Sequence, residues 1–152
     1  MNSNDLKIIE QLMRHARTTW AELGALLGLS APAAADRVRK LEEAGVIKGY
    51  AALINPDEIG CGLAAMIAVT LERPEVRSDF LRLVMNLAEV LECHHIAGEQ
   101  DYLLKVRCSG TRDLERLISE EIKALPGIKT RTTVILSTVK ETPVLPVKWE
   151  GK

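Results

Sequence analysis

Three adjacent residues, Cys93, His94 and His95, carry the side chains of this sequence that most resemble metal ligands. A structural zinc site is built from four thiolate and imidazole ligands. Because side chains alternate along a strand, Cys93 and His95 would share one face while His94 points to the other. The sequence has no second cluster of Cys and His to complete a tetrahedral set. We therefore predict no metal site and no cofactor.

Basic side chains gather in the segment Ser30–Glu43, which reads SAPAAADRVRKLEE. Bidentate hydrogen bonds to base edges come from Arg, Lys, Asn or Gln and contribute about 1–3 kcal/mol each to base discrimination. Only Arg37, Arg39 and Lys40 can supply them here, since the first turn consists of alanine and proline. Arg37 is a candidate for a phosphate contact, with a structural salt bridge to a nearby Glu as the alternative, and both interpretations stay open.

The elements around this segment are predicted to be three helices within the first 45 residues. A helical repeat with a cap at Ser3 or Asn4 predicts the first helix. Thr19 and Glu22 fit a capping box for the second, which ends at Gly28. Ser30 caps the third, and the inward-facing residues are Leu6, Ile9, Leu12, Met13, Ala16, Leu23, Leu26, Leu27, Ala34, Val38 and Leu41. This is the outline of a helix-turn-helix, with an ordinary helical hairpin as the alternative.

The spacing of the apolar residues changes after the third predicted helix. Val46–Ile54 is strand-like, and the turn-rich Asn55–Glu58 follows it. We place a helix-turn-helix domain with its hinge strand at residues 1–54 and a linker at 55–62. A second domain is expected at residues 63–140, and an irregular tail at 141–152.

The second domain contains the same order of predicted elements twice. Strands are predicted at 63–71, 90–97, 102–108 and 128–138, and helices at 74–87 and 111–125. The order is βαβ followed by βαβ, which is the split arrangement of a ferredoxin-like sandwich. Both helices would cover one face of the sheet. The sequence supplies no third layer for the other face, so we expect a partner subunit to cover it.

The turn between the predicted strands 90–97 and 102–108 is Gly98-Glu99-Gln100-Asp101. Gly98 is expected to adopt a positive backbone angle, and Asp101 is expected to cap the turn. Ligand contact is the alternative role for both residues. Tyr102, at the start of the next strand, is expected to pack in the core.

Composition limits the classes of protein that remain. The 152 residues carry a net charge of −1, and residues 1–60 contain seven Lys and Arg against eight Asp and Glu. A DNA-binding face must therefore come from local placement of charge. No apolar run approaches the ~20 residues of a membrane helix, and no signal peptide is visible. Three cysteines without a Cys-x-x-Cys motif favour reduced thiols, so we expect a cytoplasmic protein with no membrane partner.

Five stretches of the sequence together resemble the Lrp/AsnC family of transcription regulators. They are LGLS (27–30), RVRKLEEAGVIKGY (37–50), LINPDEIG (53–60), VLECHHIAGEQDYLLKV (90–106) and LPGIKTRTT (125–133). The resemblance covers residues from about 4 to 140, in the right order and spacing. The Gly-x-x-Asp-Tyr turn is its most specific part.

The resemblance implies an α+β protein with an N-terminal winged-type helix-turn-helix domain and a ferredoxin-like βαββαβ effector and oligomerisation domain. It implies dimers that assemble further, commonly to octamers, and a small effector that is usually an amino acid. It makes Ser30–Glu43 the recognition helix, with DNA contacts from Ser30, Ala31, Ala33, Asp36, Arg37, Arg39 and Lys40. It places effector contacts at Gly98, Glu99, Gln100, Asp101, Tyr102, Thr130, Thr132 and Thr133.

We therefore predict a transcription regulator that binds double-stranded DNA, responds to an amino acid and is not an enzyme. One rival is a tetrapyrrole-processing decarboxylase on the same two-domain layout, with His94 or His95 near Arg107 as acid–base or haem-contacting groups. The sequence shows no paired polar cluster suited to that chemistry. A second rival is an architectural DNA-binding protein that has no effector.

Overall fold

The computed structural model describes residues 1–148, and the chain divides into two compact units. The helical unit contains residues 1–53 together with the C-terminal tail from Lys140 onward. The sheet unit contains residues 54–139. Residues 149–152 of the expected tail lie outside the described residues. No helix of the described residues is long and apolar enough to cross a membrane.

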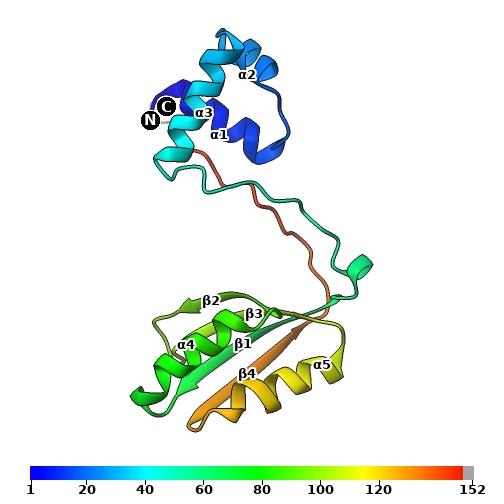
Figure 1. Ribbon diagram of the computed structural model, residues 1–152. Helices are drawn as coiled ribbons and strands as arrows, with labels where there is room; N and C mark the ends of the chain where they lie inside the picture. Colours follow the sequence, from blue (N-terminus) through cyan, green and yellow to red (C-terminus); the bar gives the residue numbers. More distant parts are fainter. Residues whose placement is uncertain (149–152) are drawn as a thin grey trace. The chain divides into compact units, whose positions relative to one another are not determined.

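The helical unit is built from α1 (Ser3–Arg14), α2 (Trp20–Leu27) and α3 (Ala31–Glu43) (Figure 1). The capping box between Thr19 and Glu22 opens α2, as predicted, and the left-handed Gly28 ends it. The Ser30 hydroxyl accepts a hydrogen bond from the Ala33 amide at 3.3 Å and caps α3. The helix-turn-helix outline is therefore confirmed.

The cap of α1 lies one residue earlier than predicted. Asn2, rather than Ser3 or Asn4, is the N-cap, because its side chain accepts a hydrogen bond from the Asp5 amide while the Asp5 carboxylate accepts one from the Asn2 amide. This reciprocal pair satisfies two amides that the helix itself leaves unpaired.

The core of the helical unit gathers one stripe from each helix. Its buried residues are Ile8, Leu12, Leu23, Ala34, Val38 and Leu41. The predicted stripe of α2 was wrong at Leu26, which is 49% exposed, whereas Ile8 of α1 is fully buried. Leu26 faces away because Leu23 and Leu27 already occupy the side of α2 that packs against the other helices.

The predicted hinge strand Val46–Ile54 is an irregular segment in this chain. Its apolar side chains are open to solvent, with Leu53 77% and Ile54 61% exposed. A strand requires the hydrogen bonds of a neighbouring strand. The described residues of this chain place no strand beside the segment, which is why the alternating pattern alone does not form one.

The sheet unit contains β1 (Leu63–Leu71), β2 (Val90–His95), β3 (Tyr102–Cys108) and β4 (Ile128–Ile135). All neighbouring pairs are antiparallel, and the order across the sheet is β2-β3-β1-β4. This is the predicted ferredoxin-like topology. β4 ends at Ile135 rather than at 138, because Ile135 is already opposite Ala64 at the beginning of β1.

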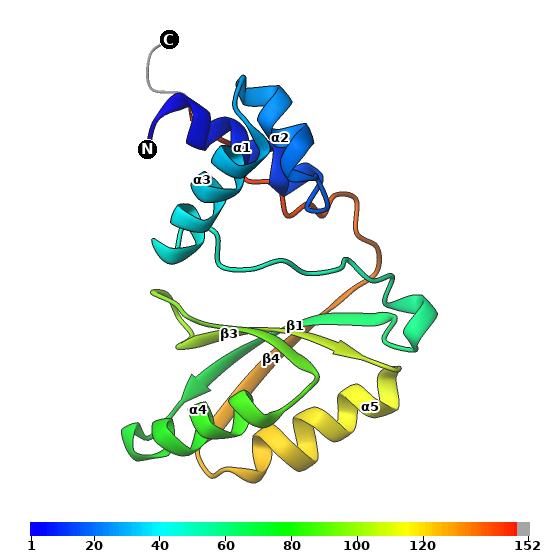
Figure 2. The same cartoon turned by 45° about the horizontal axis from the view of Figure 1, so that its top comes forward.

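Helices α4 (Arg77–Asn86) and α5 (Thr111–Arg116) lie on the same face of the sheet in both views (Figures 1 and 2). A 3-10 turn, Pro74–Val76, precedes α4, and a π-helical turn, Leu117–Glu121, continues α5. Core side chains from the strands and helices fill the layer between them; the fully buried ones include Ala65, Ile67, Val69, Phe80, Leu104, Val106, Leu117 and Ile122.

Candidate functional site

The exposed surface of α3 begins with a turn of small side chains. Ala31, Ala33 and Ala35 are half-buried, whereas Pro32 is exposed. The Ser30 oxygen accepts the capping hydrogen bond, but its hydroxyl proton is still available to a partner. This turn therefore offers backbone amides, one hydroxyl and methyl groups to a ligand such as DNA.

Arg37 is occupied inside the helical unit. Its guanidinium donates to Asp5 Oδ1 at 2.8 Å and to Asn2 Oδ1 at 3.3 Å. Both acceptors belong to the capping box of α1, so Arg37 fastens the beginning of α1 to the middle of α3. Of the two interpretations left open by the sequence, the geometry favours a structural ion pair, but its partner is Asp5 and not the expected Glu.

Arg39 and Lys40 are the basic side chains of α3 that remain at the surface. Lys40 Nζ lies 2.8 Å from Asp36 Oδ2, and Arg39 also pairs with Asp36. The hydrogen bond from Lys40 is the largest cause that keeps the pKa of Asp36 below its usual value; burial opposes it, and the charges of Lys40 and Arg39 lower the pKa further. Exposed ion pairs of this kind are weak, so both cations can exchange Asp36 for a phosphate at little cost.

The turn between α2 and α3 depends on a close approach at Gly24. The Leu29 amide donates to the Gly24 carbonyl at 2.8 Å, and a Cβ atom at Gly24 would lie 2.6 Å from the Leu29 carbonyl oxygen. Gly28, with φ of 66°, then turns the chain toward α3. Backbone contact across this turn sets the spacing of the two helices.

Tyr50 connects the irregular segment after α3 back to that helix. Its hydroxyl donates to Glu42 Oε1 at 2.8 Å. Partial burial, together with the hydrogen bond and negative charge of Glu42, raises the pKa of Tyr50 to about 12. The hydrogen bond therefore persists through the neutral pH range.

In the sheet unit, Asp101 joins the Gly98–Asp101 turn to β1. Its Oδ2 atom accepts a hydrogen bond from the Leu71 amide at 2.7 Å, and its own amide donates to the Val69 carbonyl at 2.9 Å. The Asp101 carbonyl also accepts a hydrogen bond from the Ile96 amide. Asp101 thus closes the turn with its backbone carbonyl, whereas its carboxylate bonds β1 instead of capping the turn as expected.

The expectation of a positive backbone angle at Gly98 was wrong. The residues with positive φ are Gly28, Gly45, Gly49, Gly60 and Gly127. A Cβ atom on Gly98 would meet nothing within 4 Å. Neither backbone strain nor packing inside the described chain therefore requires a glycine at this position.

Gly98 and Glu99 are exposed, and Gln100 is half-buried. Tyr102, by contrast, is only 3% exposed, and its ring packs against Phe80 and His95, with ring-centre distances of 5.1 and 5.0 Å. The Arg77 guanidinium lies 5.7 Å from the centre of the same ring. The buried Tyr102 hydroxyl has no hydrogen-bond partner among the described residues. Tyr102 thus packs as expected, while the three residues before it form the accessible part of the turn.

The three candidate threonines of β4 do not share a face. Thr130 and Thr132 are opposite the buried Val69 and Ile67, whereas Thr133 is opposite Met66 on the face that no helix covers. Residues directly opposite each other in an antiparallel pair point to the same side. Thr130 lies at the end of the sheet where Asp101 joins β1, and Thr133 lies further along the strand on the other side.

The cysteine and histidines of β2 alternate as predicted. His94 Nε2 lies 3.0 Å from Glu92 Oε2, whereas His95 stacks on Tyr102 on the helix-covered side. The hydrogen bond with His94 is the main cause that lowers the pKa of Glu92. The described residues contain no group of three or more His, Cys, Asp or Glu side chains placed to hold a metal ion.

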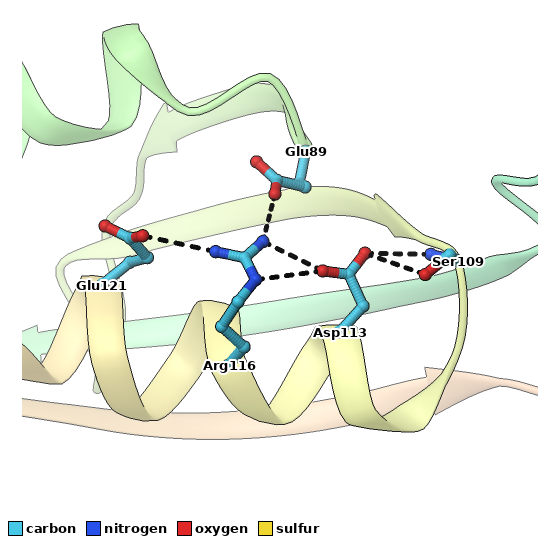
Figure 3. Close-up of polar contacts among 5 residues, drawn as sticks. All are labelled: Glu89, Ser109, Asp113, Arg116 and Glu121. Carbon is cyan, nitrogen blue, oxygen red and sulfur yellow. Dashed lines mark hydrogen bonds and ion pairs between the residues drawn. The ribbon is translucent and has the colours of Figure 1, made fainter.

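One polar cluster of the sheet unit was not found from the sequence. Arg116, at the end of α5, contacts Glu89, lies 2.9 Å from Asp113 Oδ1 and lies 3.3 Å from Glu121 Oε1 (Figure 3). The Ser109 amide also donates to Asp113 and is the main cause that lowers the pKa of that carboxyl group. The cluster links β3, α5 and the segment before β2, so its role is to hold the sheet unit together.

Sequence spacing could have signalled only part of these contacts. Asp113 and Arg116 are three residues apart in a helix, a spacing that brings side chains together. Arg37 and Asp5 are 32 residues apart, and Glu89 and Arg116 are 27 apart, so no local pattern reports either pair.

A helix-turn-helix joined to a ferredoxin-like domain with an accessible glycine turn is the organisation of a DNA-binding regulator that carries a separate ligand domain. Comparison with known families agrees for each part. Residues 1–48 match the family described as winged helix-turn-helix DNA-binding. Residues 64–145 match the Lrp/AsnC ligand binding domain.

Whole-chain relatives give the same result. The chain is 36% identical to the leucine-responsive regulatory protein of Haemophilus influenzae, over 97% of this chain and 91% of the relative. It is 37% identical to that of Escherichia coli K12, over 95% and 90%. This protein belongs to the Lrp/AsnC family of DNA-binding transcription regulators, a family of regulators rather than enzymes.

Solved structures of similar proteins share the fold. A transcriptional regulator from Neisseria meningitidis, in complex with L-methionine, has a TM-score of 0.91 at 30% identity and covers 96% of each chain. A feast or famine regulatory protein from M. tuberculosis, complexed with L-methionine, has a TM-score of 0.82 at 37% identity, covering 90% of this chain and 94% of that one. No comparison favours the tetrapyrrole-processing alternative.

Proposed function

We propose that this protein controls transcription by placing α3 in the major groove of DNA, and that an amino acid bound beside the Gly98–Asp101 turn changes its assembly or its DNA binding. The observation that carries the proposal is the pairing, in one chain, of a helix-turn-helix with an accessible turn in a ligand-binding domain. The two relatives solved with L-methionine support an amino acid as the class of effector.

The surface of α3 supports modest base specificity. Because Arg37 is paired with Asp5, base contacts fall to Arg39 and Lys40 and to the small groups of the first turn, including Ser30, Ala31 and Ala33. Phosphate contacts position a protein without reading sequence. Shape and bendability of the site would then carry much of the selection. A selection experiment that returned a long, strictly defined base sequence would contradict this view.

Backbone groups around Gly98–Gln100 are the proposed binding partners of the effector's ammonium and carboxylate groups. No hydrogen bond within the described residues uses the amides of Gly98, Glu99 or Gln100. Gln100 is the candidate for effector specificity. Thr130 is the threonine best placed to contribute a hydroxyl at this end of the sheet, and Thr132 and Thr133 remain weaker candidates.

A homo-oligomer follows from two surfaces that one chain leaves uncovered. The helix-free face of the sheet carries the half-buried Met66, Ala68 and Leu103, and the segment Val46–Ile54 exposes Leu53 and Ile54 without a strand beside it. A second copy of the chain would bury both, and dimers could assemble further to octamers. Several DNA-binding domains on one oligomer would raise DNA affinity, because binding of one domain increases the effective concentration of the others near the DNA. The cytoplasm is the proposed location.

The decisive experiment is fluorescence anisotropy of the full-length protein with labelled DNA from its own upstream region. It is repeated with a scrambled competitor duplex, across salt concentrations, and with and without L-methionine and other amino acids. We expect binding that survives the competitor, weakens steeply with salt and changes with at least one amino acid. Equal loss to the scrambled duplex with no amino-acid effect would favour the architectural alternative.

A further inference from the structure

The C-terminal tail of the described chain belongs to the helical unit rather than to the sheet unit that precedes it in sequence. The Leu145 amide donates to Met13 Sδ of α1 at 3.4 Å, and Figures 1 and 2 draw the tail beside this helix. Val144 and Val147 are half-buried, although the prolines and leucine around them are exposed. This alternation indicates that one side of the tail packs against the helical unit.

The chain consequently passes between the two units twice. The first passage follows α3 and enters the sheet unit at Ile54. The second leaves β4 and returns to the helical unit at Lys140. Leu136–Val139 are the four residues between Ile135 and Lys140. The side chains of Leu136 and Val139 are 96% and 99% exposed. Four residues span at most about 14 Å when fully extended, so this second passage is short.

We propose that the docked tail is a second tether, which transmits effector-induced changes in β4 to the DNA-binding helices of the same chain. This inference rests on the proposed function. β4 carries the candidate effector residues Thr130, Thr132 and Thr133, and it runs directly into the tether. At the other end the tail contacts Met13 of α1, and α1 is fastened to α3 through Asp5 and Arg37.

The route therefore consists of covalent chain from β4 to Leu145, then one docking contact on α1, then one ion pair to the recognition helix. In this route a shift of β4 acts on the docked end of the tail through Leu136–Val139, the four residues that join them. The passage through Val46–Ile54 is anchored on α3 by Tyr50 and Glu42 and gives an independent connection. Removing the tail should consequently uncouple the effector from DNA without abolishing either binding event.

The docking is tested by cysteine cross-linking in the full-length protein. In a background of Cys61→Ser, Cys93→Ser and Cys108→Ala, the pair Met13→Cys and Leu145→Cys is compared with Arg14→Cys and Leu145→Cys. Arg14 is the exposed neighbour of Met13 on α1 and provides the matched control. We expect mild oxidation to form a disulfide within one chain for the Met13 pair and far less for the Arg14 pair. Equal yields for both pairs, or a covalent dimer, would overturn the proposal.

The coupling is tested by anisotropy on the upstream DNA with and without L-methionine, in three variants. One lacks residues 140–152, one carries Val144→Asp and Val147→Asp, and a control lacks only residues 149–152. Typical allosteric coupling changes affinity about 5–150-fold. We expect the control to keep the amino-acid response of the full-length protein, and the other two to respond less than about twofold while still binding DNA and L-methionine.

An undiminished response in the two tail variants would overturn the tether. If the full-length protein binds DNA but no amino acid alters it, the proposed effector function fails, and the coupling fails with it. The cross-linking result does not depend on DNA or effector, so failure of the docking and failure of the proposed function are distinguishable.

Discussion

At the scale of single residues, Gly24 is where the helix-turn-helix tolerates least change. Gly24→Ala should destabilise the helical unit by roughly 1–3 kcal/mol, because the new methyl group overlaps the Leu29 carbonyl oxygen. The overlap with backbone outweighs the helix propensity that alanine gains, about 1 kcal/mol. Thermal unfolding followed by circular dichroism measures the effect. Gly98→Ala is the matched control and should leave stability unchanged, since its Cβ meets nothing; equal stability of both variants would contradict the prediction.

Arg37 and Lys40 are expected to behave differently although both are basic residues of α3. Arg37→Ala should lower the melting temperature of the helical unit, because Asp5 and the capping residue Asn2 lose their partner. Lys40→Ala should leave the melting temperature unchanged but weaken DNA binding and reduce the salt slope by about one. Anisotropy titrations across salt, paired with melting curves, separate the two effects. A stable Arg37→Ala protein with selectively lost DNA binding would show that Arg37 contacts DNA instead.

Tyr50 provides a prediction about pH. Its folded-state pKa of about 12 lies above the ordinary value of 10.0, so the neutral hydroxyl is the form that the folded protein favours. The stabilisation is present below pH 10.0 and is lost as the pH rises toward about 12. Ultraviolet titration of the phenol groups, with Tyr50→Phe to assign the step, measures it. Glu42→Gln should lower this pKa only in part, because burial is the larger cause; ionisation of Tyr50 near 10.0 in the unmodified protein would refute the contact.

At the scale of elements, Asp101 decides how the Gly98–Asp101 turn is attached to β1. Asp101→Ala should destabilise the sheet unit by roughly 1–2 kcal/mol, since the Leu71 amide loses a charged acceptor at 2.7 Å. Asp101→Asn keeps a neutral acceptor and should cost less. Urea denaturation of both variants tests this order. If Asp101→Ala were as stable as the unmodified protein, the carboxylate would not be what attaches the turn to β1 and would be available to the effector.

At the scale of the whole molecule, assembly depends on the sheet face that no helix covers. Met66 is on that face, so Met66→Asp should shift the protein from dimer to monomer, because it places a charge where we propose a partner's side chains. Met85→Asp makes the same change at an exposed position of α4 and serves as the control. Sedimentation velocity measures both. A dimer that survives Met66→Asp at low micromolar concentration would place the interface elsewhere.

The fold and family of this protein could be predicted from local patterns. Some features can be recognised from a few neighbouring residues. They are capping residues such as Thr19 and Ser30, the glycine that ends α2, and the alternation of apolar and polar residues in the strands. Each reports a hydrogen bond or a buried face that forms within one element, and their order along the chain was enough to indicate the ferredoxin-like topology. The Gly-x-x-Asp-Tyr turn then connected that topology to a family.

Tertiary structure alone decided which side chains are available for function. Arg37 is withdrawn from the DNA-binding surface by Asp5, 32 residues away, and the Asp101 carboxylate is held by the Leu71 amide, 30 residues away. The Val46–Ile54 segment forms no strand, since its alternating pattern finds no neighbour in one chain. The tail joins the helical unit through its contact with Met13, a residue 132 positions away in the sequence. Contacts between residues distant in the chain leave no periodic trace, so only the folded arrangement reveals them.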